Sequence, residues 1–176
     1  MNFKEIELKG AFLINLQKND DDRGFFARSF CREEFKKAGI DFNIVQSNIS
    51  YNKKKGILRG LHYQSAPHEE AKLISCPRGA ICDVVIDLRR DSSTYCEWFA
   101  LELSDRNYLS LYIPEGFAHG FQTLEDDTIV SYQMSEFYYP DLARGIRWDD
   151  RVFNIDWPIT SCILSNKDAN YPDFKR

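Results

Sequence analysis

The sequence predicts an all-β fold in which short antiparallel strands form a sandwich or a barrel. Outside one helical segment, the chain shows short apolar runs that are separated by turn-forming residues. These strand-like runs follow one another without intervening helices. Helices that alternate with strands indicate a parallel sheet, whereas strands in direct succession are typical of antiparallel sheets.

The single predicted helix covers Arg32 to Ala38. Its first turn carries two glutamates and its last turn carries two lysines, which suits the dipole of a helix. Gly39 follows at the position where a helix C-cap is expected. One short helix does not make an α protein.

The strands are clearest in the second half of the chain. Two runs, Lys72–Cys76 and Ala80–Asp87, flank a Pro-Arg-Gly turn and are expected to form a tight hairpin. Further strands are expected over Cys96–Leu103, Tyr108–Ile113, His119–Leu124 and Thr128–Met134. The turn-rich segment after Trp148 is expected to wrap around the barrel instead of forming a second domain.

Length and charge limit the classes of protein. A chain of 176 residues is expected to form one domain, residues 1–176, with a core that needs no metal or disulfide to hold it. The net charge of −4 argues against nucleic acid or an anionic membrane as a partner. The N-terminus lacks the apolar core of a signal peptide, so the five cysteines are expected to stay reduced in the cytoplasm.

Two of the three histidines lie in segments that are rich in glycine. His62 ends the run Gly-Ile-Leu-Arg-Gly-Leu-His, and His119 ends the run Pro-Glu-Gly-Phe-Ala-His. Glycine and proline at this density mark a turn at which the backbone approaches a neighbour or a ligand, or a simple connection between strands. His68, beside Pro67 and two glutamates, is expected in a surface loop and is given no role.

Together these two segments resemble the paired motifs of cupins, which are small jelly-roll barrels. The first motif corresponds to Gly56, His62 and Glu69, and the second to Pro114, Gly116 and His119. Metal-binding cupins usually carry a second histidine where this chain has Gln64, and a neutral amide is a weak metal ligand. No metal is therefore expected. A bound metal, if found, would point to His62, Glu69 and His119 as its ligands.

Without a metal, His62 could serve as a general base, since imidazole titrates near neutral pH. Removing a proton from carbon requires an adjacent carbonyl and a cation for the enolate, which Lys72 could supply. Inversion also requires an acid on the opposite face. Tyr132 is a candidate because strand alternation places it on one face with Val130 and Met134. The alternatives are a solvated lysine at a strand end and a core tyrosine.

Ten short segments, in order over nearly the whole chain, carry a more specific likeness. They are Asp22–Phe26, Gln46–Asn48, Leu58–Gln64, Lys72–Leu73, Arg78–Gly79, Asp83–Arg89, Ile113–Phe121, Gly145–Asp149, Ile155–Pro158 and Leu164–Asp168. This combination resembles the dTDP-4-dehydrorhamnose 3,5-epimerase family. The resemblance implies a cupin-type jelly roll with one or a few short helices, no cofactor, a homodimer, and a nucleotide-sugar substrate. The implied activity is epimerisation of a nucleotide-linked 4-keto-6-deoxyhexose at C3, C5 or both.

The resemblance also implies roles for individual residues. His62 corresponds to the base, Asp168 to its hydrogen-bonding partner, Lys72 to the residue that stabilises the enolate, and Tyr132 to the acid. The positions implied to contact the substrate are Arg23, Phe26, Arg28, Gln46, Asn48, Arg59, His119 and Lys167.

Four positions depart from the usual family pattern. Arg28 and Ala143 stand where glutamates are usual, and Gln133 stands where a lysine usually follows the tyrosine. Phe137, followed by two tyrosines, stands where a tyrosine often packs near the base. An arginine in place of an acceptor could favour a cytidine over a thymidine nucleotide. Epimerisation at C3 alone or C5 alone, 3,4-ketoisomerisation, and a noncatalytic or metal-binding cupin are the other open alternatives.

Overall fold

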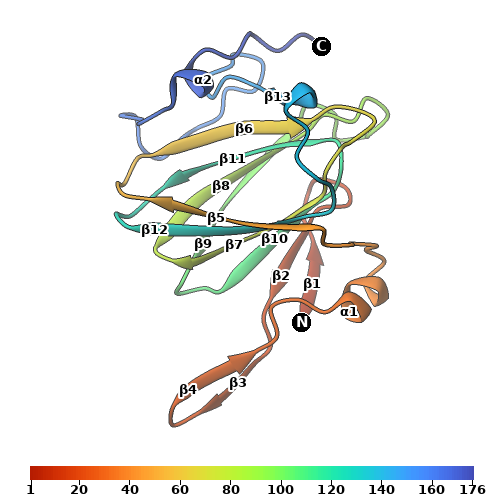
Figure 1. Ribbon diagram of the computed structural model, residues 1–176, viewed down its shortest axis with the longest axis vertical. Coiled ribbons are helices and arrows are strands. Elements are labelled where there is room, and N and C mark those ends of the chain that lie inside the picture. Colours follow the sequence, from red (N-terminus) through yellow and green to blue (C-terminus); the bar gives the residue numbers. More distant parts are fainter.

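The computed structural model describes all residues 1–176, and nearly all of its regular secondary structure consists of strands (Figure 1). The strands are β1 (Asn2–Glu5), β2 (Phe12–Asn15), β3 (Lys18–Asp21), β4 (Gly24–Ala27), β5 (Gln46–Asn52), β6 (Leu58–Gln64), β7 (Lys72–Arg78), β8 (Ala80–Asp87), β9 (Trp98–Ser104), β10 (Leu109–Ile113), β11 (Phe117–Thr123), β12 (Thr128–Met134) and β13 (Ala143–Gly145). The helices are α1 (Arg32–Lys37), the 3₁₀ turn η1 (Pro140–Leu142) and α2 (Asn166–Ala169). None of them has the length and apolar character that a membrane-spanning helix needs.

Two sheets lie face to face in a jelly-roll sandwich, as Figure 1 shows. The six-stranded sheet has the order β1-β2-β10-β7-β12-β5, and the five-stranded sheet has the order β13-β6-β11-β8-β9. Neighbouring strands in both sheets are antiparallel. The predicted all-β class, the helix at α1 and the strands from Lys72 onward are confirmed.

The main core fills the space between the two sheets. Its buried side chains come from alternate positions of the facing strands, for example Ile74 and Val130 from one sheet and Ile81 and Val85 from the other. Alternation puts these residues on one face because successive side chains of a strand point to opposite sides. The same face of β12 carries Tyr132, which packs against this core.

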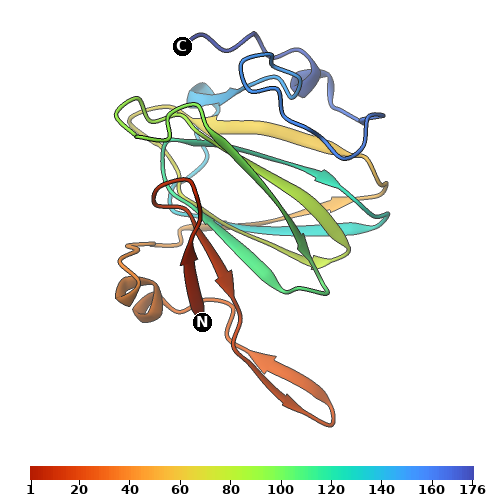
Figure 2. The same cartoon turned by 180° about the vertical axis from the view of Figure 1, so that it is seen from behind.

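The outer face of the five-stranded sheet is also buried, because the C-terminal segment covers it. Phe153 and Trp157 of this segment pack against Val84 and Ile86 of β8. Trp98 Nε1 donates a hydrogen bond to the backbone oxygen of Phe153 (2.9 Å), which fixes the segment in place. Figure 2 shows the segment, in blue, at the top of the molecule next to β6, the yellow strand. The predicted wrapping of the tail is confirmed, and it explains why β8 is apolar on both faces.

The predicted hairpin between the strands at Lys72 and Ala80 is wrong. β7 belongs to the six-stranded sheet and β8 to the five-stranded sheet, so the chain crosses from one sheet to the other at Gly79. Gly79 has a positive φ of 77°, and its backbone NH donates to Asp105 Oδ2 (2.8 Å). A single glycine is too short a connection for a two-residue hairpin turn, and it makes a corner between the layers instead.

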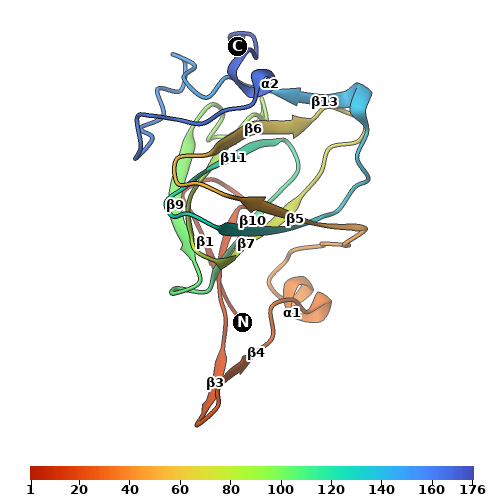
Figure 3. The same cartoon turned by 60° about the vertical axis from the view of Figure 1, so that its left-hand side comes forward.

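An arm formed by β3 and β4 projects away from both sheets, as Figure 3 shows. The two strands pair only with each other. Phe26 on this arm is 74% exposed. No strand was predicted here, because β3 reads Lys-Asn-Asp-Asp and lacks any apolar alternation.

Two glycines allow β6 and β11 to approach closely next to the two histidines. A Cβ on Gly60 would lie 2.6 Å from Gly120 Cα and 2.8 Å from the backbone oxygen of His119. The register of the two strands shifts at this point, and His119 is paired directly with His62. The approach therefore sets the position of both imidazoles.

A buried carboxylate organises the corner after β8. Asp87 accepts hydrogen bonds from Arg89 Nη2 (2.7 Å), Ser92 Oγ (2.6 Å) and Thr94 Oγ1 (2.7 Å). Burial raises the pKa of Asp87, but these donors outweigh burial and lower its pKa from 3.8 to about 2. The carboxylate therefore stabilises the fold in its charged form.

We expect Asp87→Asn to reduce the free energy of unfolding by about 2 kcal/mol at pH 7, since the folded-state pKa lies nearly two units below the unfolded value. The contribution of Asp87 is complete above its unfolded pKa and disappears as the pH falls through about 2. Urea unfolding of both proteins from pH 7 to pH 2 measures this difference. A difference that grows toward low pH would contradict the assignment.

We expect Gly60→Ala to cost about 3 kcal/mol or more, because the new methyl group would overlap the backbone of β11. Gly24→Ala is the matched control. Its φ of 127° resembles the 119° of Gly60, but no atom lies within 4 Å of the added methyl. The control should show only the cost of backbone strain, about 1 kcal/mol. If both variants lost the same free energy of unfolding, the close approach of β6 and β11 would not be the cause of the loss at Gly60.

Candidate active site

A cavity of about 450 Å³ lies between the two sheets. Side chains from β5, β7 and β12 of one sheet and from β6 and β11 of the other sheet line it. Residues from β13 and the C-terminal segment complete the wall. The cavity gathers most of the residues that the sequence predicts for the site: Gln46, Asn48, Arg59, His62, Lys72, His119, Tyr132 and Lys167.

His62 lies on β6 and forms a hydrogen-bonded pair with a carboxylate from the C-terminal segment. Its Nε2 lies 2.7 Å from Asp168 Oδ1. The imidazole is 43% exposed, whereas the Asp168 side chain is 7% exposed. Asp168 thus reaches His62 from the closed side, and the ring remains accessible from the cavity.

Helix α2 holds this carboxylate in place. Ser165 caps the helix, and its Oγ accepts a hydrogen bond from the backbone NH of Asp168 (3.1 Å). Burial raises the pKa of Asp168, but hydrogen bonds from His62 and Ser165 outweigh burial and lower it below its usual value of 3.8. Asp168 is therefore an ionised acceptor near neutral pH. An ionised carboxylate can only accept, so Nε2 is the donor in this hydrogen bond, and Nδ1 carries the lone pair in the neutral form of the ring.

Lys72 begins β7 and crosses the space between the sheets. Its Nζ donates to the backbone oxygen of His62 (3.2 Å) and forms an ion pair with Glu70 Oε1 (3.0 Å). Both side chains are buried, with 7% of Lys72 and 6% of Glu70 exposed. An ammonium group can make three hydrogen bonds, so one donor of Lys72 is left after these two contacts.

Tyr132 approaches the cavity from the sheet opposite to His62. It lies on β12 of the six-stranded sheet, whereas His62 lies on β6 of the five-stranded sheet. Burial raises the pKa of the Tyr132 phenol above 10, although Arg59 partly offsets this effect. The phenol therefore keeps its proton at neutral pH.

His119 forms a second buried pair beside the first. Its Nε2 lies 2.7 Å from Asp83 Oδ1, and both residues are buried. His119 pairs with His62 across the strands and with Val85 of β8 on its other side. His119 was predicted to contact the substrate, and its place in the cavity wall agrees with this prediction.

The cavity is positively charged although the protein is negatively charged overall. Four cationic residues line it, namely Arg59, Lys72, Arg144 and Lys167, and Glu70 is the one carboxylate among the lining residues. Arg59, Arg144 and Lys167 are exposed, so they can meet a ligand at the rim. Guanidinium and ammonium groups in this arrangement suit the oxygens of a diphosphate.

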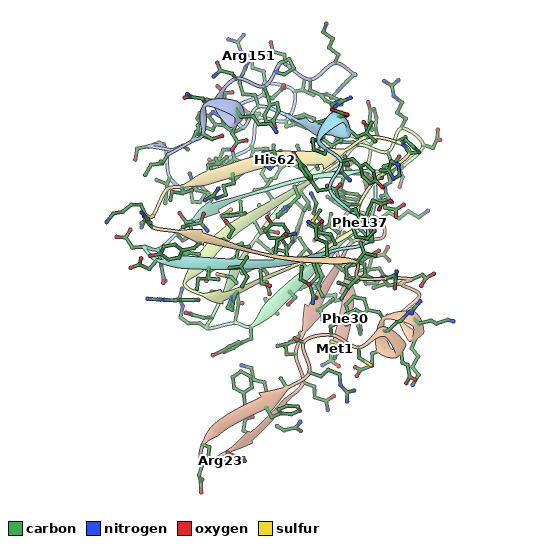
Figure 4. All side chains as sticks on the ribbon, viewed as in Figure 1. Met1, Arg23, Phe30, His62, Phe137 and Arg151 are labelled. Atoms are coloured by element: carbon green, nitrogen blue, oxygen red, sulfur yellow. The ribbon has the colours of Figure 1, made fainter.

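Three predicted substrate contacts do not lie in this cavity. Arg23 and Phe26 are on the β3–β4 arm, and Figure 4 shows Arg23 at its far tip, away from His62. Arg28 follows the arm, and its Nη1 donates to Glu34 Oε1 of α1 (2.7 Å). The motif match alone gave no information about which part of the fold carries these residues.

Gln64, which replaces the second cupin histidine, has a structural role. Its Nε2 donates to the backbone oxygens of His68 (2.8 Å) and Phe137 (3.1 Å), and its Oε1 accepts from the NH of Tyr139 (2.6 Å). The amide thereby fixes the segment after β12. In this segment Tyr138 lines the cavity, whereas the predicted Phe137 is 57% exposed.

Several cavity residues were not predicted, including Glu70, Arg144 and Tyr171. The Tyr171 ring packs edge-on against His62, with centroids 5.9 Å apart, and it occupies the space that a side chain at Gly145 would need. The glycine of the Gly-Ile-Arg-Trp motif was a usable signal for this close contact.

Glu69, a predicted alternative metal ligand, is not among the residues that line the cavity. The structure contains no group of three His, Cys, Asp or Glu side chains suited to a metal ion.

Comparisons with known proteins agree with this geometry. The family model described as dTDP-4-dehydrorhamnose 3,5-epimerase matches residues 5–176. Relatives of that name are 41% identical in Sinorhizobium fredii, over 98% of this chain and 89% of the relative, and 42% identical in Methanothermobacter thermautotrophicus, over 96% and 92%.

Solved structures are similar over the same length. The dTDP-4-dehydrorhamnose 3,5-epimerase of Bacillus anthracis, with TDP and PPi bound, has a TM-score of 0.96 at 42% identity and covers 98% of this chain and 99% of its own. A 3'-monoepimerase from Streptomyces bikiniensis, in complex with dTDP-quinovose, has a TM-score of 0.89 at 32% identity, over 96% and 85%. The chain described above belongs to the dTDP-4-dehydrorhamnose 3,5-epimerase family of nucleotide-sugar epimerases.

Proposed function

We propose that this protein inverts both C3 and C5 of a dTDP-linked 4-keto-6-deoxyhexose without a cofactor, with His62 as base and Tyr132 as acid. The observation that carries the proposal is the position of these two side chains on opposite sheets of one cavity, with Lys72 between the sheets. Inversion needs this arrangement, because the proton must leave one face of the sugar ring and return on the other.

His62 is proposed to remove the proton. Carbons next to the C4 ketone carry acidic protons, and Nδ1 of the neutral ring can accept one while Asp168 stabilises the imidazolium that forms. The hydrogen bond of 2.7 Å between Nε2 and Asp168 fixes both the tautomer and the orientation of the ring.

Lys72 is proposed to stabilise the enolate. As the C–H bond breaks, its electron pair becomes the C=C bond and the carbonyl oxygen gains negative charge. The remaining donor of the buried ammonium group can meet that charge. By analogy with oxyanion-hole donors, such a contact contributes roughly 3–4 kcal/mol to the transition state. Tyr132 then donates its phenolic proton to the carbon from the opposite face.

The names of the relatives support the proposed nucleotide and the proposed positions of inversion. Relatives of about 40% identity carry the name of a 3,5-epimerase, whereas the similar 3'-monoepimerase is 32% identical. The cationic rim of the cavity suits the diphosphate of the nucleotide. Gln46 and Asn48, which lie on the inner side of β5, are proposed to contact the nucleotide.

We also propose that residues 1–176 form one domain that acts as a homodimer in the cytoplasm. An isolated two-stranded arm is marginally stable in water, and this one exposes Phe26. Strand β5 exposes Ile49 (75%) and Tyr51 (48%) on the outer face of the six-stranded sheet. The arm of one copy, packed on this face of another, would bring Arg23 and Phe26 to the partner's cavity.

The five free cysteines support the proposed location in a reducing compartment, the cytoplasm.

We expect His62→Ala to lower turnover by about 10²- to 10⁴-fold, the usual contribution of a general base. Affinity for dTDP should change little, because the imidazole is assigned to the sugar and not to the nucleotide. His68→Ala is the control. His68 pairs with Glu136 and stacks on Tyr139, outside the proposed machinery, so this variant should keep its activity. Full turnover in the His62 variant would show that the base is assigned wrongly.

We expect light scattering to give about twice the mass of 20.6 kDa, the value for a C2 dimer. A chain with both Arg23→Ala and Phe26→Ala and a chain with His62→Ala should each be nearly inactive alone. When co-expressed, they should regain about a quarter of the wild-type activity, since half of the dimers are mixed and each of these has one complete site. A monomeric mass, or no recovery in the mixed dimers, would contradict the exchanged arm.

A further inference from the structure

Glu70 is the one carboxylate that lines the cavity and has no place in the proposed reaction. It lies two residues before Lys72, and its side chain is 6% exposed. Oε1 pairs with Lys72 Nζ at 3.0 Å, whereas Oε2 is buried and has no hydrogen-bond partner. The lysine therefore satisfies only half of this carboxylate.

Burying a carboxylate oxygen without a hydrogen-bond partner lowers the free energy of unfolding. A salt bridge through the other oxygen does not offset this loss. Such groups are rare in folded proteins, and a functional role is one of the explanations for them. Because Glu70 lines the cavity, a bound ligand can supply the missing hydrogen bond. The final torsion of a glutamate side chain is soft, so a small rotation can turn Oε2 toward the cavity while Oε1 stays on Lys72.

We propose that Glu70 recognises the substrate by accepting a hydrogen bond from the C3 hydroxyl of the sugar. The inference rests on the proposed function, in which Lys72 contacts the oxygen at C4. In a 4-keto-6-deoxyhexose, the C3 hydroxyl is the only hydroxyl on a carbon next to the carbonyl. The carbonyl and the hydroxyl lie on adjacent carbons of the sugar, and Lys72 and Glu70 are likewise in contact. The lysine can therefore bind the carbonyl oxygen while the carboxylate binds the hydroxyl.

The pair thus recognises an α-hydroxy ketone as a unit. Lys72 donates to the carbonyl oxygen, which can only accept, and Glu70 accepts from the hydroxyl, which can donate. A sugar without the C3 hydroxyl leaves Glu70 Oε2 buried and unpaired, so the site selects against it. Glu70 is in this account a specificity-determining residue.

The test compares two substrates in three proteins. The substrates are dTDP-4-keto-6-deoxyglucose and its 3-deoxy counterpart, and the proteins are wild type, Glu70→Ala and the control Glu69→Ala. Exchange of the protons next to the ketone with solvent deuterium measures kcat/KM for both substrates in the same way. Wild type and the Glu69 variant should prefer the hydroxylated sugar by roughly 10- to 100-fold, the effect of one hydrogen bond to a charged group.

Glu70→Ala should lose this preference, so that both sugars exchange at similar rates. Equal losses on the two sugars, with the preference intact, would show that Glu70 only supports Lys72 and would overturn the proposal. A wild type without any preference would overturn it as well. If Glu70→Ala does not fold, Glu70→Gln keeps the shape of the side chain and should weaken the preference. A wild type that exchanges neither sugar would instead refute the proposed function itself.

Discussion

The hydrogen bond between His62 and Asp168 is the contact on which the active site depends. It joins a strand of the five-stranded sheet to a helix near the C-terminus, 106 residues away in sequence. The tail must therefore fold across the outer face of the sheet before the imidazole acquires its tautomer. The apolar outer face of β8 therefore matters for the site. Phe153 and Trp157 pack on this face and anchor the C-terminal segment, which carries Asp168.

The two-layer architecture also separates the two groups that are proposed to act on opposite faces of the substrate. His62 comes from one sheet and Tyr132 from the other, and Lys72 links the two layers through its bond to the His62 backbone. The close approach at Gly60 and Gly120 fixes the position of β6, the strand that carries His62. Burial raises the pKa of the Tyr132 phenol, so the phenol keeps the proton that the proposed acid must donate.

The sequence predicted the elements whose signals are local and missed those that depend on distant partners. The strands from Lys72 onward are short apolar runs separated by turn-forming residues, so they could be located. Their pairing could not, because the corner at Gly79 has the same local pattern as a hairpin turn. The motif match found His62, Lys72 and Tyr132, which share one cavity, and Asp168, which pairs with His62 from behind it. It could not show that Arg23 lies on a projecting arm. Glu69 and Glu70 look alike in sequence, and only the structure distinguishes them, because Glu70 pairs with Lys72 and lines the cavity whereas Glu69 does not line it.

The most direct test of the central claim is deuterium exchange by a Tyr132→Phe variant in heavy water, with the configuration of each sugar carbon followed by NMR. If His62 and Tyr132 act from opposite faces, the variant should still exchange the protons next to the ketone, because the imidazole can return a deuteron to the face it serves. It should not invert those carbons. Inversion at the wild-type rate without the phenol would contradict the account.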